Sequence, residues 1–294
     1  MIKVFEVTKY FDNYKALDDI SLHVRKGTIY GLVGPNGAGK TTIINHINGV
    51  LKPLKGTIEI DGEAVYENIK AKGRIVNISD DWYYYGTVKD MADFYRSMYP
   101  NFSNERFESM KNIFEIDVKR PIRKLSKGMK KQVAFWVSLS AMPDILILDE
   151  PLDGLDPVMR KQILNLVIAD VADRGMTVLV SSHNLRELED ICDWVGIIHK
   201  GKMIVEKPLD DLKGNVHKYQ VVFGESGVAE FEDAVHISNN GAVYNIILRG
   251  TAEETEAKIK AVSPVLCQHI SLTLEEVFIY ELGGLGYDFK NIIV

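Results

Sequence analysis

Short apolar runs alternate with longer amphipathic segments through residue 200 of the chain. The apolar runs are bounded by glycine or polar residues, which is typical of buried strands. They are TIYGLVG (28–34), ILILD (145–149), MTVLVSS (176–182) and VGIIHK (195–200). Helical spacing of apolar residues predicts helices in TTIINHINGVL (41–51), MRKQILNLVIADVADRG (159–175) and LRELEDICD (185–193). Strands that alternate with helices predict an α/β fold.

Three further segments depart from this alternation. GTIEIDGEAV (56–65) alternates in polarity like an exposed hairpin. Residues 88–142 predict a helix-rich block inserted between strands, with Pro100 and Pro121 as breaks. Beyond a boundary near 213–218, the alternation of KYQVVF, VYNIILRG, TAEETEAKIKAV, VLCQHI and LTLEEVFIYEL predicts a small α+β region. We therefore expect one domain over 1–215 and a C-terminal accessory region over 216–294.

Composition and charge exclude several classes of protein. The chain has 294 residues and a formal net charge of −6, which argues against a nucleic-acid backbone as the main partner. The two cysteines, Cys192 and Cys267, stand far apart, so we expect neither a disulfide framework nor a zinc site. No run reaches the eighteen or so apolar residues of a membrane span, and no signal peptide is visible at the start. We expect the chain itself to be soluble.

The strongest local motif is GPNGAGKT at residues 34–41, between a predicted strand and a predicted helix. It matches the G-x-x-x-x-G-K-[ST] pattern of a phosphate-binding loop, whose glycines allow successive N–H groups to face one phosphate cluster. Lys40 is then expected to contact the β- and γ-phosphates, and the Thr41 hydroxyl to bind Mg²⁺. The predicted nucleotide-binding residues of this loop are Gly34, Asn36, Gly37, Ala38, Gly39, Lys40, Thr41 and Thr42. A glycine-rich helix cap without a ligand is the alternative.

A second candidate site follows the strand ILILD. Asp149 ends this strand at the edge where open α/β sheets hold ligands, so we expect its carboxylate to orient Mg²⁺. Glu150, one residue further, is expected to accept a proton from the attacking water. His183 ends another predicted strand and is expected to reach the γ-phosphate. The alternatives are a loop acid for Glu150 and a structural histidine for His183.

Residues 2–215 resemble an ATP-binding-cassette (ABC) ATPase subunit, and LSKGMKKQ (125–132) is the discriminating segment. It resembles the signature loop of that family, usually L-S-G-G-Q, and stands before ILILDEP as the family's loop does. The resemblance implies a P-loop NTPase cassette with an antiparallel β subdomain, an inserted helical subdomain and here an α+β appendage. It also implies that Ser126 and Gly128 contact ATP bound to a second ABC ATPase subunit, in a homodimer or heterodimer.

Two further segments carry the same resemblance. DGLD, ending at Asp156, resembles the loop that couples the two ATP sites, and Phe11 matches the aromatic residue that stacks on adenine. For Phe11 the alternative is a core residue, and Tyr10 is adjacent. Lys127 and Met129 depart from the usual signature, although related export-type subunits carry S-K-G-M. Where the family has a glutamine-containing loop, this chain has Asp80 or Asp81, and Asp80 is our candidate Mg²⁺ ligand.

Trp82 to Tyr85 form an aromatic run that no single strand or helix face buries. By resemblance, this run borders the groove for a cytoplasmic helix of a membrane permease; packing against the helical block is the alternative. The implied function is the ATPase subunit of an exporter, at the inner face of the membrane, with ATP and Mg²⁺ as cofactors and peptides or antimicrobials as substrates. A soluble ABC ATPase not coupled to transport and a regulatory cassette with weak hydrolysis are the alternatives.

Overall fold

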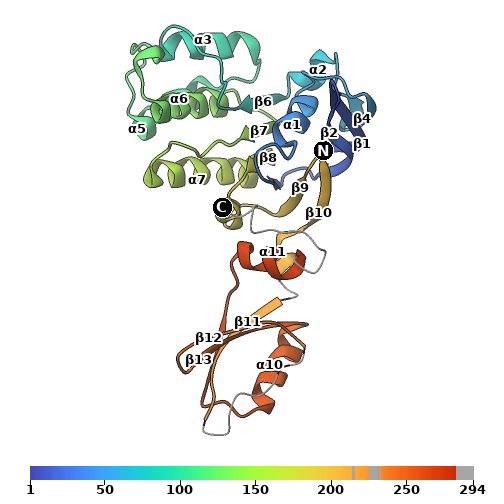
Figure 1. Ribbon diagram of the computed structural model, residues 1–294. Helices are drawn as coiled ribbons and strands as arrows, with labels where there is room; N and C mark the ends of the chain where they lie inside the picture. The colour runs from blue at the N-terminus through green and yellow to red at the C-terminus, as the bar shows by residue number, and fades with distance from the viewer. Residues whose placement is uncertain (214–215, 225–230, 232, 283–294) are drawn as a thin grey trace. The chain divides into compact units, whose positions relative to one another are not determined.

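The computed structural model describes residues 1–213, 216–224, 231 and 233–282, and it divides into two compact units. The first unit holds residues 1–183 and 191–206; the second holds 184–190 and 207 onward. The segment 184–190 therefore belongs to the C-terminal unit although it lies inside the sequence expected to form the first domain. Figure 1 shows the helices and strands of both units and labels many of them.

A six-stranded sheet forms the centre of the first unit, in the order β10-β9-β3-β8-β7-β6. The pairs β9–β3, β3–β8, β8–β7 and β7–β6 are parallel. The strands are β3 (Ile29–Val33), β6 (Ile75–Ile78), β7 (Ile145–Asp149), β8 (Thr177–Ser182), β9 (Trp194–His199) and β10 (Lys202–Pro208). Every residue of β3, β7 and β8 is buried, as expected for strands covered on both faces. The parallel order brings the carboxyl ends of β3, β7 and β8 to one edge.

A second, antiparallel sheet in the first unit has the strand order β2-β1-β4-β5. Its strands are β1 (Ile2–Phe11), β2 (Tyr14–Val24), β4 (Lys55–Ile60) and β5 (Glu63–Ala64). Alternate residues of β2 are buried and join one core with β3 and with α1 (Lys40–Ile47). The β1–β2 turn leaves Phe11 and Tyr14 facing solvent at 45% and 60% exposure.

The helical block consists of short helices that pack around one long helix, α6 (Lys127–Ser140). The others are α3 (Val88–Met98), α4 (Asn104–Ser109), α5 (Lys111–Phe114) and the 3₁₀ turn Ile122–Lys124. Trp136 of α6 is fully buried, and its ring centroid lies 4.7 Å from that of Phe107. Its indole N–H donates to the main-chain carbonyl of Phe107 at 2.8 Å. Side-chain caps at Thr87, Ser103 and Ser126 start α3, α4 and α6.

Outside the helical block, α2 (Ile69–Lys72) follows β5, α7 (Pro157–Arg174) follows β7 and α8 (Leu185–Glu189) follows β8. Helix α8 belongs to the second unit. Asp156 caps α7 and Gly175 ends it in the left-handed conformation.

The predicted α/β fold with an antiparallel sheet and a helical block is confirmed. Within the described residues, no helix combines the length and apolarity needed to cross a bilayer.

The C-terminal unit contains a four-stranded antiparallel sheet in the order β12-β13-β11-β14. Its strands are β11 (Val216–Val222), β12 (Ala234–Asn240), β13 (Val243–Arg249) and β14 (Leu266–Ile270); its helices, besides α8, are α9 (Leu209–Lys213), α10 (Ala252–Ala261) and α11 (Leu274–Leu282). Tyr219, Ile246 and Ile259 form part of its core. The expected α+β region is confirmed, although β12 was not predicted. Cys192 is buried and Cys267 exposed, and neither forms a disulfide.

Candidate active site

The loop between β3 and α1 has the conformation that the glycine pattern predicts. Gly39 caps α1 with φ at +113°, a value that residues with a side chain rarely adopt. Ala38 N–H donates to the Pro35 carbonyl at 3.1 Å, and Gly201 N–H donates to the Ala38 carbonyl at 2.9 Å. These bonds hold the loop as a tight turn whose helix N-terminus favours an anion.

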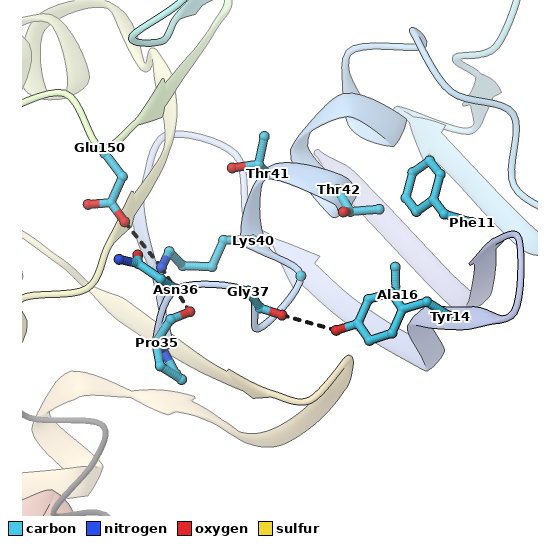
Figure 2. Close-up of a pocket in the computed structure, with 11 residues that line it drawn as sticks. Phe11, Tyr14, Ala16, Pro35, Asn36, Gly37, Lys40, Thr41, Thr42 and Glu150 are labelled. Atoms are coloured by element: carbon cyan, nitrogen blue, oxygen red, sulfur yellow. Dashed lines mark hydrogen bonds and ion pairs between the residues drawn. The ribbon is translucent and has the colours of Figure 1, made fainter.

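Lys40 is 5% exposed, and its ammonium group is surrounded by oxygen atoms. Nζ donates to the Gly34 carbonyl at 2.5 Å and lies 3.1 Å from Glu150 Oε1. A buried ammonium requires such partners, because leaving a charge unpaired in the interior is costly. Figure 2 shows Lys40 between the loop and Glu150.

The Glu150 carboxylate contacts both Lys40 at the start of α1 and His183, which follows β8. Its Oε1 faces Lys40, while its Oε2 lies 2.8 Å from His183 Nδ1 and accepts the His183 main-chain N–H at 3.3 Å. Glu150 also adopts a left-handed backbone with φ at +47°, which is uncommon for a residue with a side chain. The carboxylate predicted as a base and the histidine predicted at the γ-phosphate are therefore in contact.

Asp149 is 7% exposed at the end of β7. Ser181 of β8 donates its hydroxyl to Asp149 Oδ1 at 2.5 Å, which fixes the carboxylate. Asp149 and Thr41 line one pocket of about 290 Å³, together with Asp80 and Asp81. The three residues predicted as Mg²⁺ ligands, Thr41, Asp149 and Asp80, therefore face a common space.

Asp80 also binds two lysines of α6. Lys127 Nζ lies 2.9 Å from Oδ2 and Lys131 Nζ lies 2.9 Å from Oδ1. Burial raises the pKa of Asp80, but the hydrogen bonds from the two lysines outweigh it and the pKa lies below its ordinary value. The carboxylate is thus ionised at neutral pH. Its role as a metal ligand stays a prediction, and any cation there shares the carboxylate with two ammonium groups.

A second pocket, of about 260 Å³, runs from the Glu150 carboxylate to the β1–β2 turn. Lys40 and Glu150 line one end, and Phe11 and Tyr14 line the other (Figure 2). Tyr14 Oη donates to the Gly37 carbonyl at 3.4 Å. The sequence analysis does not identify Tyr14, and Tyr10, the residue adjacent to Phe11, is not among the lining residues.

Phe11→Ala and Tyr14→Ala are each expected to weaken ATP binding by about 1 to 3 kcal/mol, because an aromatic ring that stacks on a base contributes about that much. Phe5→Ala is a matched control, since Phe5 is also an exposed ring on β1 but lies outside the pocket. Fluorescence titration with ATP measures the three affinities. Unchanged affinity in both pocket variants would remove the aromatic end of the pocket from the nucleotide site.

The signature segment forms the start of α6. Ser126 is exposed and caps the helix, accepting the Met129 N–H at 3.2 Å. Gly128 packs against the loop that follows β7: a Cβ at this position would lie 2.6 Å from the Gly154 carbonyl oxygen. Any larger residue at 128 would have to move that backbone, so this glycine is required by close approach.

The loop containing Gly154 contributes two carboxylates with different surroundings. Asp156 accepts the main-chain N–H groups of Val158 and Met159, so its side chain caps α7. The Asp-Pro sequence at the start of a helical segment is the signal for this cap. Asp153 instead lies near Glu150 and His183, with side-chain oxygen or nitrogen atoms of the three residues within 4.8 Å of one another. Nucleotide contact by Asp156 stays a prediction.

The aromatic run supports both interpretations in part: Trp82 and Tyr84 pack against the helical block, whereas Tyr83 is exposed. Trp82 Nε1 donates to Tyr95 Oη of α3 at 2.9 Å, and Lys130 Nζ donates to Tyr84 Oη at 2.8 Å, so these two rings pack against the helical block. Tyr83 is 70% exposed. It lines a groove of about 250 Å³ with Phe94 and Met98 of α3.

Comparisons with known proteins extend this description. A sequence model of the family described as ABC transporter matches residues 17–153. The chain is 32% identical over 288 residues to the ABC transporter ATP-binding protein YtrB of Bacillus subtilis (strain 168), covering 97% of this chain and 99% of that protein. It is 34% identical over 233 residues to the bacitracin transport ATP-binding protein BcrA of Bacillus licheniformis, covering 74% and 73% of the two chains.

Solved structures agree with these sequence relatives. A structure of an ATP-binding subunit of an ABC transporter superposes with a TM-score of 0.67 at 27% identity, over 72% of this chain and 92% of the other. The cbiO1 protein of Clostridium perfringens, described as part of the transporter complex cbiONQ, gives a TM-score of 0.61 at 27% identity, over 72% and 89% of the two chains.

Proposed function

Because the chain belongs to the ABC transporter family as an ATP-binding subunit that hydrolyses ATP, we propose that it drives export through a separate membrane permease by ATP-dependent head-to-tail dimerisation. The observation that carries the proposal is the position of Glu150, whose two carboxylate oxygens face Lys40 and His183. In this arrangement, the phosphate-binding lysine and the proton acceptor share one end of a single pocket.

The chemical roles follow from these contacts. Lys40 neutralises charge on the β- and γ-phosphates, and Glu150 accepts a proton from the attacking water. His183 is 40% exposed and holds Glu150 Oε2 through Nδ1, which leaves the other side of the ring for the γ-phosphate. Release of Lys40 from Glu150 toward ATP frees Oε1 for the water. ATP binding thereby prepares the base.

Thr41 and Asp149 fit a Mg²⁺ site, because the Thr41 hydroxyl and the Asp149 carboxylate line the same pocket. The hydrogen bond from Ser181 fixes the orientation of that carboxylate. Asp80 is the third candidate ligand. When bound, Mg²⁺ supplies positive charge that offsets the phosphates of ATP. The part of this chain is to present hard oxygen donors beside the P-loop.

Ser126 and Gly128 are proposed to complete the ATP site of a second ABC ATPase subunit, with Asp156 nearby. Exposure of Ser126 at a helix start supports this role, since that end of a helix favours anions. A mixture of two inactive variants tests it. Lys40→Met and Ser126→Arg each disable both sites of their own homodimer, but a mixed head-to-tail dimer keeps one intact site.

The mixture is expected to hydrolyse ATP faster than either variant alone, at roughly a quarter of the wild-type rate if pairing is statistical and the sites are independent. Mixing Lys40→Met with Glu150→Gln is the matched control, because both changes affect the same half-site and no mixed dimer regains an intact one. Phosphate release measures the rates. Equal rates in the two mixtures would contradict the shared site.

The permease and the substrate are inferred from the exposed groove and from the relatives. A permease helix inserted between Tyr83 and Met98 would hold the chain at the inner face of the membrane. BcrA is described as a bacitracin transport protein and SrtF of Streptococcus pyogenes as a lantibiotic transport protein, each at 33–34% identity. We propose peptides or antimicrobials as the exported substrates.

Tyr83→Ala combined with Met98→Ala is expected to abolish permease-stimulated ATP hydrolysis and to leave hydrolysis by the isolated chain unchanged, because both side chains are largely exposed at the groove. Ile69→Ala is the matched control, since Ile69 is 88% exposed and outside the groove. Stimulation is measured with the permease in lipid vesicles. Full stimulation of the double variant would place the permease contact elsewhere.

A further inference from the structure

Lys131 is a buried lysine of α6 that the reaction described above does not use. It is 5% exposed, whereas most lysines of soluble proteins keep their ammonium group in water. Nζ donates to the main-chain carbonyl of Glu150 at 2.9 Å and lies 2.9 Å from Asp80 Oδ1. A single ammonium group thus joins α6, the end of β7 and the segment after β6.

The carbonyl that Lys131 binds belongs to a residue with an unusual backbone. Glu150 has φ at +47°, and a conformation of this kind persists only where surrounding contacts impose it. Its N–H group is held by Ser181 of β8, with the carbonyl oxygen at 3.3 Å and the hydroxyl at 3.2 Å. Its C=O group is held by Lys131. The two contacts come from different elements and fix both sides of the same residue.

This backbone conformation decides where the Glu150 carboxylate lies. From it, Oε1 reaches Lys40 and Oε2 reaches His183. Rotation of the main chain at residue 150 would move both oxygens, because the side chain projects from the Cα atom that φ and ψ orient. The contact made by Lys131 therefore acts on the base without touching a reacting atom.

The ion pair with Asp80 stabilises the charged ammonium group of Lys131 at this buried position. The Asp80 carboxylate accepts from Lys131 through Oδ1 and from Lys127 through Oδ2, and Lys127 directly follows Ser126. Lys127 and Lys131 are four residues apart and share one face of α6. Movement of the signature end of α6 would therefore reach Glu150 through Lys131.

We propose that Lys131 is a positioning residue for ATP hydrolysis: it holds the left-handed backbone of Glu150 and couples it to the helix that carries the signature loop. The proposal rests on the role of Glu150 proposed above. It assigns to Lys131 an effect on the rate of the chemical step and none on nucleotide affinity, since Lys131 does not line the pocket that runs from Phe11 to Glu150.

The test compares Lys131→Met, Lys131→Gln and Lys131→Arg in the full chain with MgATP as the probe. Methionine keeps the length of the side chain without its charge, and glutamine keeps a hydrogen-bonding group that is shorter and uncharged. Both are expected to lower kcat by about tenfold to a hundredfold, the effect of small displacements of a catalytic group, and to leave KM within about twofold. Arginine is expected to restore most of kcat. Lys161→Met, an exposed change on α7, is the control for loss of a lysine.

Two results would overturn the proposal. One is a wild-type kcat in a folded Lys131→Met or Lys131→Gln variant. The other is a fall in kcat that arginine does not restore and that comes with a matching rise in KM and a lower melting temperature, the pattern of a merely structural lysine. Glu150→Gln is measured in parallel. If that variant keeps wild-type turnover, the proposed role of Glu150 is wrong. If Glu150→Gln loses turnover while Lys131→Met keeps the wild-type kcat, only the role of Lys131 is rejected.

Discussion

Glu150→Gln is expected to lower ATP turnover by roughly 10² to 10⁴-fold, because an amide cannot accept the proton that general base catalysis removes from water. The variant keeps a side chain of the same size and can still bond to His183. ATP binding is expected to persist, since Lys40 no longer has a carboxylate competing with the phosphates. Sedimentation with ATP should then reveal a dimer that the wild type forms only transiently. Phosphate release gives the turnover.

Asp153→Asn is the informative comparison for this result. The Asp153 carboxylate lies in the same group as Glu150 and His183, within 4.8 Å, so it is the nearest competitor for the role of base. We expect its loss to reduce turnover less than loss of Glu150, because Glu150 alone of the two contacts Lys40. A full loss in Asp153→Asn with near-normal turnover in Glu150→Gln would exchange the two roles.

Lys40→Met is expected to weaken ATP binding by roughly a hundredfold or more, because each charge-assisted hydrogen bond contributes about 1.5 to 3 kcal/mol and this ammonium would serve two phosphates. Methionine is close in length, so the turn between β3 and α1 should keep its form through the bonds of Ala38. Titration with a fluorescent ATP analogue measures the affinity. Turnover should fall with it.

Lys40→Arg separates charge from geometry. The guanidinium group keeps the positive charge but is planar and wider, and the space around Nζ is closed by the Gly34 carbonyl at 2.5 Å. We expect arginine to recover only a small part of the affinity. Wild-type affinity in both variants would show that the loop binds nucleotide without its lysine, which would contradict the assignment of the motif.

Local sequence was sufficient for those parts of the site that one turn or one strand end contains. The glycines of GPNGAGKT permit a conformation that other residues resist, and Gly39 adopts it. The apolar run ILILD forms a fully buried strand, so Asp149 and Glu150 had to emerge at its end. The place of His183 at the end of another predicted strand indicated its expected role, whereas the expected roles of Ser126 and Gly128 came from the family resemblance.

Long-range contacts lay beyond this reasoning. Tyr14 enters the pocket because the β1–β2 turn brings it beside Gly37, and its own position in the sequence carries no sign of that. The strand Ala234–Asn240 is mostly exposed, so it lacks the alternating apolar pattern that identifies strands. Its pairing with β13 provides the hydrogen bonds that its side chains do not reveal.

The sequence by itself determined the alternation of buried strands with helices, the phosphate-binding turn and the carboxylates at the sheet edge, because periodicity and backbone preference act over a few neighbouring residues. Only the tertiary structure decided that Lys40, Glu150 and His183 meet, that Asp80 faces two lysines, and that Lys131 reaches the Glu150 carbonyl. Those pairs are separated along the chain by strands and helices. The distances between these residues depend on the order of the strands in the parallel sheet and on where α6 packs. The local sequence around each residue does not specify either of these.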